Sequence, residues 1–194
     1  MTTPIIKTVT TSDEAQAIAV VVLAFGADPA ARWTWPDPQQ YLMHFPSFVK
    51  ALGGNAFAHG GAYYVDGYAG AALWLPPGVR PDENALITLL QRTGSARVQK
   101  DLSAVFEQME RYHPQDPHWY LPFIAIDPCQ QGKGYGSALM KPALDACDRD
   151  HAPAYLESSN PKNIPLYERH GFELLGTIQV GTSPPIFPML RKPR

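Results

Sequence analysis

The hydrophobic pattern is clearest in the second half of the chain, where an apolar run is followed by glycines and then by helical spacing. Residues 119–126 are almost all apolar or aromatic, which is typical of a buried strand. Beyond the glycines, apolar residues recur every few positions, at Ala138, Leu139, Leu144 and Ala146. A helix is therefore expected to begin near Gly136 and to run to about residue 149.

The rest of the pattern predicts short strands and helices in mixed order. Strands are expected at residues 5–10, 62–65, 69–75, 154–158, 172–180 and 186–191, and helices at 14–25, 39–52, 81–112 and 164–170. Asp66-Gly67 signals a hairpin turn, and Gly94 marks a point where the longest helix can split. Expected helix caps are a capping box from Thr11 to Glu14, an N-cap at Asn163 and a C-terminal glycine at Gly171. This order predicts an α/β (α+β) protein, a mixed sheet flanked by helices, in a single domain spanning residues 1–194.

The glycines at positions 132, 134 and 136 lie between the predicted strand and helix. Their spacing lets the backbone turn sharply, and it leaves free N–H groups at the start of a helix, where anions bind. The pattern is neither G-x-x-x-x-G-K-[ST] nor G-x-G-x-x-G, so a nucleoside triphosphate loop and a dinucleotide loop are disfavoured. The stretch is a cradle for pyrophosphate or, alternatively, an ordinary glycine-rich turn that caps a helix.

Charge and composition exclude several functions. Sixteen basic and 18 acidic residues give a net charge of −2 without a basic cluster, which argues against binding to nucleic acid or to an anionic membrane. The longest apolar run, residues 17–25, is too short to span a bilayer, and the first residues lack the order of a signal peptide. Two cysteines, Cys129 and Cys147, cannot make a metal site alone and are expected to serve in packing. We expect a cytoplasmic, metal-free protein that is a monomer or a homodimer.

Two motifs resemble those of the GNAT (GCN5-related) family of N-acetyltransferases. The glycine stretch is similar to the acyl-CoA loop of that family, Q/R-x-x-G-x-G/A, through Gln131, Gly134 and Gly136. A second motif follows at the usual spacing, with Asn160, Tyr167 and Gly171-Phe172. The resemblance implies a mostly antiparallel central sheet with a splayed strand pair, and it implies acetyl-CoA as the acyl donor.

The resemblance also implies roles for individual residues. Backbone groups of Ile124, Ala125 and Ile126 would pair with the pantetheine arm of the cofactor. The pyrophosphate would be held by Gln131, Gly132, Lys133, Gly134, Tyr135, Gly136 and Ser137, with the Lys133 charge as a further partner. Tyr167 would protonate the leaving thiolate, because a phenol is protonated at neutral pH and can donate to a developing anion.

For other residues the sequence allows both a structural and a functional interpretation. Glu157 lies in an otherwise apolar strand and is either a satisfied structural carboxylate or a base that takes the proton of the amine through water. Asn160 and Asn163 are either turn and cap residues or ligands of the cofactor arm. The histidines at positions 113, 118, 151 and 170 are expected to be solvated or capping residues, because none occupies a matched catalytic position.

The acceptor amine is expected on the side of the splayed strands opposite the cofactor. An aromatic segment and its neighbours supply the candidates Asp28, Arg32, Trp33, Trp35, Tyr41 and Trp74, each of which has packing in the core as its alternative. The predicted function is transfer of acetyl from acetyl-CoA to a small-molecule amine by direct attack on the thioester. Its alternatives are acetylation of a protein or peptide amine, and a non-catalytic acyl-CoA sensor.

Overall fold

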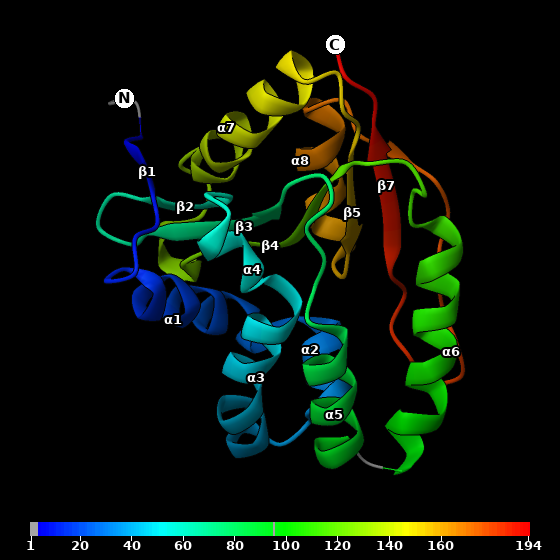
Figure 1. The fold of residues 1–194 in the computed structure, drawn as a ribbon. Helices are drawn as coiled ribbons and strands as arrows, with labels where there is room; N and C mark the ends of the chain where they lie inside the picture. Colours follow the sequence, from blue (N-terminus) through cyan, green and yellow to red (C-terminus); the bar gives the residue numbers. More distant parts are fainter. Residues whose placement is uncertain (1–3, 95) are drawn as a thin grey trace.

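The computed structural model describes residues 4–94 and 96–194, and its strands form one seven-stranded sheet (Figure 1). The spatial order is β1 (Ile6–Thr8), β2 (Ala62–Val65), β3 (Gly70–Leu75), β4 (Trp119–Ile126), β5 (Ala154–Ser158), β7 (Phe187–Arg191) and β6 (Glu173–Leu174). Neighbouring strands run antiparallel, except that β4 and β5 run parallel. The predicted mixed, mostly antiparallel sheet is confirmed.

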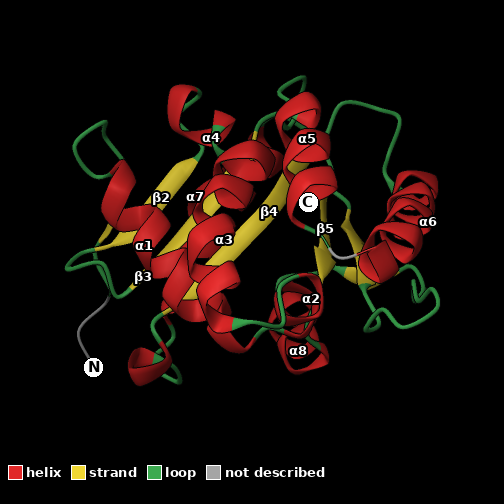
Figure 2. Ribbon diagram, turned by 90° about the horizontal axis from the view of Figure 1, so that it is seen from below, coloured by secondary structure: helices red, strands yellow, loops and turns green. Residues whose placement is uncertain are grey.

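Helices from the first half of the chain cover the lower face of the sheet in Figure 1. They are α1 (Glu14–Ala24), α2 (Pro29–Thr34), α3 (Pro38–Gly53), α4 (Asn55–Ala58) and α5 (Glu83–Thr93). Buried side chains of α1 and α3 pack against β3 and β4 in one apolar cluster, and Figure 2 shows both helices lying across the strands. The helix α6 (Ala96–Tyr112) stands beyond β5 and β7 in both views. The long predicted helix is therefore split near Gly94, as expected.

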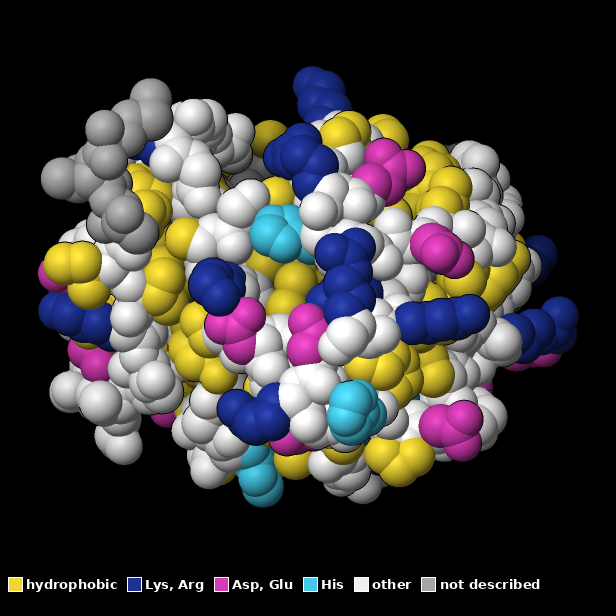
Figure 3. Space-filling view, turned by 90° about the horizontal axis from the view of Figure 1, so that it is seen from above, with side chains coloured by type: hydrophobic (Ala, Val, Ile, Leu, Met, Phe, Trp, Pro, Cys, Tyr) yellow, Lys and Arg dark blue, Asp and Glu magenta, His cyan; other side chains and the backbone are white. Residues whose placement is uncertain are grey.

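The upper face of the sheet is covered by α7 (Tyr135–Arg149) and α8 (Ile164–Arg169). Their apolar residues form a second buried cluster with the residues of β3, β4 and β5 that point upward. Basic and acidic side chains are interspersed on the outer surface of this side of the molecule (Figure 3). Within residues 4–94 and 96–194, no helix is both long and apolar enough to cross a membrane.

The strands β4 and β5 pair over a short distance and then separate. Their register ends with Tyr120 opposite Tyr155, although β4 continues to residue 126 and β5 to residue 158. On its other edge, β4 has one residue more than β3 between the pairs of Leu73 and Leu75. Such a bulge bends a strand and is common beside functional sites. The predicted splayed strand pair is present, and it opens the sheet at its centre.

The predicted capping box is wrong, and the predicted N-cap Asn163 is confirmed in position only. The helix α1 begins after Asp13, and the Asp13 carboxylate accepts hydrogen bonds from the backbone N–H and the hydroxyl of Thr10. These contacts form a turn before the helix, so no capping box forms from Thr11 to Glu14. Asn163 precedes α8 but caps nothing with its side chain, whereas Asn160 accepts from the Lys162 N–H.

The strand predicted at residues 172–180 is also largely wrong. Only Glu173–Leu174 forms a strand, and a single bridge joins Ile178 to Ile186. The backbone at Gly176 passes so close to the Tyr112 ring that any Cβ there would overlap the ring. This contact with α6 turns the chain away from β7. The packing role expected of the cysteines holds for Cys147, which is buried, but not for the exposed Cys129.

An ion pair between a buried arginine and a partly exposed aspartate joins the end of α7 to the last strand. The Arg191 guanidinium, 4% exposed, donates to both carboxylate oxygens of Asp148 at 2.8 Å and to the His170 carbonyl at 2.9 Å. Hydrogen bonding to Arg191 is the main cause that lowers the pKa of Asp148 to about 2, from its ordinary value of 3.8. A carboxylate whose pKa is depressed by folding stabilises the fold above its unfolded pKa, and this contribution is lost as the pH falls toward 2.

We therefore expect Asp148→Asn to lower the free energy of unfolding at pH 7 by roughly 1.5–3 kcal/mol, because the charge-assisted bonds to Arg191 are lost. The melting temperature should fall by roughly 4–10 °C. The variant should also lose less stability than the wild type between pH 4 and pH 2. Asp145→Asn is the matched control, because it breaks an exposed ion pair with Lys141 on the same helix, where an effect under about 1 kcal/mol is expected. Equal melting curves for both variants would contradict the prediction.

Candidate active site

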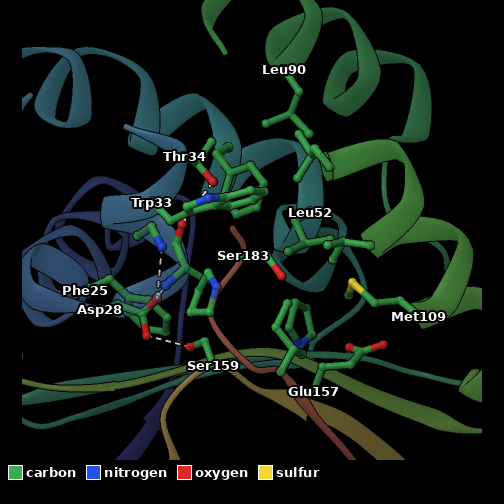
Figure 4. Close-up of a pocket in the computed structure, with 18 of the residues that line it drawn as sticks. Phe25, Asp28, Trp33, Thr34, Leu52, Leu90, Met109, Glu157, Ser159 and Ser183 are labelled. Carbon is green, nitrogen blue, oxygen red and sulfur yellow. Dashed lines mark hydrogen bonds between the residues drawn. The ribbon is translucent and has the colours of Figure 1, made fainter. Parts of the chain in front are cut away.

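A mostly apolar cavity of about 130 Å³ lies between the lower face of the sheet and the helices α2, α3, α5 and α6. Figure 4 shows it from the side, with the sheet as its floor. A wider cleft of about 630 Å³ adjoins it, and the two share Tyr120 and Glu157 as lining residues. The volume of the smaller cavity is close to the roughly 150 Å³ of a protein cavity that admits benzene. The smaller cavity can therefore hold one ring-sized apolar group.

The boundary between the cavity and the cleft is marked by the carboxylate of Glu157. Glu157 follows Tyr155 by two residues on β5, so both side chains point to the lower face. Its side chain is 5% exposed, and among the described residues Oε1 has no hydrogen-bond partner. A basic side chain, the His113 imidazole, lies close to it, with Nδ1 3.7 Å from Oε1. A carboxylate that faces a cavity is positioned to accept a proton from a group bound there.

Two phenols flank this carboxylate. Tyr120 and Tyr155 are the last register pair before β4 and β5 separate. Burial raises the pKa of each phenol, and the negative charge of Glu157 raises both further. Both phenols therefore stay protonated at neutral pH, and they cannot take protons from a substrate.

At the other end of the cavity floor, Asp28 and Ser159 lie side by side (Figure 4). The Ser159 hydroxyl donates to Asp28 Oδ2, while Oδ1 accepts from the N–H groups of Ala30 and Ala31 at 3.0 Å. Asp28 is thus the N-cap of α2. Burial raises the pKa of Asp28, while these hydrogen bonds lower it.

The predicted leaving-group acid, Tyr167, lies in α8 and is 5% exposed. Its ring meets that of Phe172 edge-on, with centroids 6.2 Å apart, inside the upper cluster. Burial raises the pKa of Tyr167 well above its usual value, and the Asp28 charge raises it further. The phenol therefore keeps its proton at neutral pH, as a proton donor must.

The predicted acceptor residues separate into two groups. Trp33 and Trp35 line the cavity, and their indole N–H groups donate to Thr182 Oγ1 at 3.2 Å and to Thr93 Oγ1 at 3.1 Å. Asp28 lines it as well, as described above. The others, Arg32, Tyr41 and Trp74, lie outside its lining.

The assignment of Tyr41 and Trp74 to the acceptor wall is wrong, because both are core residues. Tyr41 is 3% exposed and donates to the Val22 carbonyl at 2.6 Å, with the Arg32 guanidinium 5.5 Å from its ring centre. Trp74 is fully buried on the opposite face of the sheet, where strand alternation directs it toward α7.

The glycine loop has the backbone geometry of an anion cradle. Gly132 and Gly134 have φ values of +76° and +81°, which only glycine adopts without strain. The 15-residue helix α7 begins at Tyr135, and no side chain caps its N-terminus. Gln131 and Lys133 are exposed, the latter bonded to Gln130 Oε1 at 2.6 Å, while Tyr135, Gly136 and Ser137 form the half-buried first turn.

The edge of β4 beside this loop is open. Ile124, Ala125 and Ile126 pair with β3 on one side and have no strand partner on the side of β5. The structure therefore brings an unpaired strand edge, free helix N–H groups and the Glu157 cavity to the point where the sheet opens. Asn160 and Asn163 lie in the segment that follows β5. Asn160 precedes the short helical turn at residues 161–163, and Asn163 ends it, directly before α8.

Sequence reasoning missed the histidines next to Glu157. His113 and His118 were expected to be solvated or capping residues, but their Nε2 atoms lie 3.0 Å apart, and the His113 ring packs edge-on against Tyr120 and Tyr155. The available signal was a proline loop that carries a histidine at each end and leads directly into the buried strand β4.

Comparison with known proteins agrees with this geometry. The family model described as the acetyltransferase (GNAT) family matches residues 93–172. A curated but uncharacterised N-acetyltransferase of Schizosaccharomyces pombe is 29% identical over 185 residues, which cover 86% of this chain and 73% of that protein.

Solved structures show the same fold. A Corynebacterium glutamicum protein described as histone acetyltransferase HPA2 and related acetyltransferase superposes with a TM-score of 0.72 at 25% identity, covering 100% of this chain and 98% of that one. The polyamine N-acetyltransferase of Drosophila melanogaster gives a TM-score of 0.68 at 12% identity, with 98% and 100% covered. The protein belongs to the GNAT family. Within that family it is an N-acetyltransferase enzyme.

Two substitutions of Asp28 can distinguish its role as the N-cap of α2 from a role of its negative charge in the cavity. We expect Asp28→Ala to destabilise the protein by roughly 1–2 kcal/mol, because α2 loses its N-cap. Asp28→Asn keeps an oxygen for the two N–H groups, so its melting temperature should stay close to that of the wild type. Thermal unfolding of both variants decides the question. An Asn variant as unstable as the Ala variant would contradict the capping role.

Proposed function

We propose that this enzyme transfers an acetyl group from acetyl-CoA to the amine of a small molecule. The observation that supports this most is the apolar cavity with a buried carboxylate, Glu157, where β4 and β5 separate. An amine in the cavity would meet a proton acceptor on one side. On the other side it would meet the gap between the strands.

The donor side fits acetyl-CoA, which supplies an activated acetyl group as a thioester. We assign the open strand edge at Ile124, Ala125 and Ile126 to its pantetheine arm, since unpaired backbone groups need partners. We assign its pyrophosphate to the loop and first turn at residues 131–137, where N–H groups and the helix dipole favour an anion. Asn160 and Asn163 border the same gap, and their amides are assigned to the arm.

The proposed chemistry needs one base and one acid. Glu157 takes a proton from the ammonium group, and the free amine nitrogen then forms a bond to the thioester carbon. As the C–S bond breaks, Tyr167 gives its proton to the leaving sulfur, and the second proton that the nitrogen loses as the amide forms restores the Tyr167 phenol. The fold supports this division, because Glu157 faces the lower side of the sheet and Tyr167 packs in the upper cluster.

The cavity favours an acceptor with a ring-sized apolar group beside its amine, flanked by Trp33 and Trp35. Neighbours in fold include the arylalkylamine N-acetyltransferase 2 of Aedes aegypti and the Drosophila polyamine enzyme. Within the family, the sequence resembles puromycin N-acetyltransferase, most densely after residue 113. Arylalkylamines, polyamines and aminonucleosides are therefore the first acceptors to test.

A thiol-release assay with acetyl-CoA tests the proposal directly. The acceptor panel contains those three classes and lysine-containing peptides. Turnover is expected with a ring-bearing small amine. Turnover with peptides alone would favour the protein-acetylating alternative, and acetyl-CoA binding without any turnover would favour the sensor.

The cradle predicts a specific loss of donor affinity in Gly134→Ala. Gly67→Ala is the matched control, because Gly67 has φ +79° and, as at Gly134, an added Cβ meets no atom within 4 Å. Both variants carry the same backbone strain, so similar losses in melting temperature are expected. Only Gly134→Ala should weaken acetyl-CoA binding, by about tenfold or more, because its Cβ would enter the space assigned to the pyrophosphate. Equal affinities by calorimetry would exclude the cradle.

The acid assignment predicts a different signature for Tyr167→Phe. The change removes the donor and keeps the buried ring. We expect kcat to fall by roughly a hundredfold or more, with little change in the KM for acetyl-CoA, since a leaving-group acid acts in the transition state. Steady-state kinetics measure both constants. A kcat within about twofold of the wild type would refute the role.

A further inference from the structure

The Glu157 carboxylate has little direct contact with solvent. Both Glu157 and His113 line the wide cleft, but the side chain of Glu157 is 5% exposed, whereas that of His113, 3.7 Å away, is 25% exposed. A base must release each captured proton before it can accept the next. The neighbouring phenols of Tyr120 and Tyr155 cannot serve, because burial and the Glu157 charge keep their own protons in place.

The hydrogen bonds of the histidine pair determine where the protons lie. His118 Nδ1 is 2.8 Å from the Asp116 carbonyl, and a carbonyl oxygen only accepts, so Nδ1 must carry a proton. Burial lowers the pKa of His118 and favours its neutral form, whose Nε2 then presents a lone pair. His113 Nε2, 3.0 Å away, must therefore be the donor.

This arrangement leaves Nδ1 of neutral His113 without a proton and facing the Glu157 carboxylate. Neither atom carries a proton there, so the pair becomes an ion pair across 3.7 Å when His113 takes up one proton. The Asp116 carbonyl thus acts through His118 to set the His113 tautomer that suits proton uptake.

We propose that His113 is a proton relay for Glu157. This inference rests on the proposed function, in which Glu157 is the base. The proton that Glu157 takes from the ammonium passes to His113 Nδ1 and makes an imidazolium. Loss of one proton to water or buffer in the cleft returns His113 to its neutral form. His113 touches no substrate and acts through Glu157, while His118 holds its orientation.

The groups that face this pair come from several elements. Tyr120 on β4 and Tyr155 on β5 pack against the His113 ring, and Glu110 and Tyr112 of α6 act on Tyr155. His118 also feels the charge of Arg80, from the loop before α5. Of these, Glu157 is the negative group in ion-pair range of His113, so its removal should dominate any change in proton binding.

The first experiment needs no turnover. NMR of the histidine rings in the free protein follows proton uptake by His113 in the wild type and in Glu157→Gln. Loss of the carboxylate charge, 3.7 Å from Nδ1, should move His113 protonation to lower pH. The exposed His59 is the internal control and should not move. An unchanged His113 titration would overturn the proposal, whether or not an acceptor has been found.

The second experiment uses the acceptor from the assay. We expect His113→Phe, which keeps a ring against the tyrosines, to lower kcat by roughly ten- to a hundredfold. The acidic limb of its kcat/KM profile should move down by roughly two pH units, from the range of an imidazole toward that of a carboxyl. Added imidazole should restore turnover in His113→Ala, a rescue that a merely structural residue would not show. His59→Phe is the control.

An unchanged kcat and pH profile in a folded His113→Phe would overturn the relay, and so would failure of imidazole to restore His113→Ala. If His113→Phe does not fold, His113→Gln takes its place in the same comparison. Absence of wild-type turnover across the whole panel would count against the proposed function instead, and the NMR titration would then still decide whether Glu157 and His113 share a proton.

Discussion

The parallel strands β4 and β5 stop pairing after Tyr120 and Tyr155, and the other features of the site depend on this opening. An interrupted sheet leaves backbone groups that need partners, which a folded protein supplies elsewhere or reserves for a ligand. The bulge in β4 bends the strand at the same point. The glycine loop at the end of β4 and the Glu157 carboxylate on β5 consequently border one gap.

Burial then gives the ionisable groups around the gap different properties. The phenols of Tyr120, Tyr155 and Tyr167 have raised pKa values because each loses contact with water, so all three are proton donors at neutral pH. Glu157 has a buried oxygen without a hydrogen-bond partner among the described residues and lies beside an imidazole. The proposed path of the proton from Glu157 to the cleft through this imidazole follows from these differences.

The cavity proposed for the acceptor is built from a different part of the chain than the gap proposed for the cofactor. The helices α2, α3, α5 and α6 roof the cavity, whereas the loop before α7 and the turn after β5 border the gap. Solved structures at 12% identity share the overall fold, which by itself does not fix a substrate. The proposed acceptor class therefore rests on the aromatic lining of this cavity.

The sequence alone determined the elements whose signals are local. Apolar runs located β4 and β5, and the glycines located the loop before α7, because strand length, helical spacing and positive φ depend on neighbouring residues. The motif spacing also identified the family. Tertiary structure decided the rest, since burial depends on residues far apart in the chain. Trp33 and Trp74 are the same residue type, yet one lines the cavity and the other fills the opposite core. His113 meets Glu157 across 44 positions only because β4 and β5 are paired at their first residues, and no local pattern encodes that meeting.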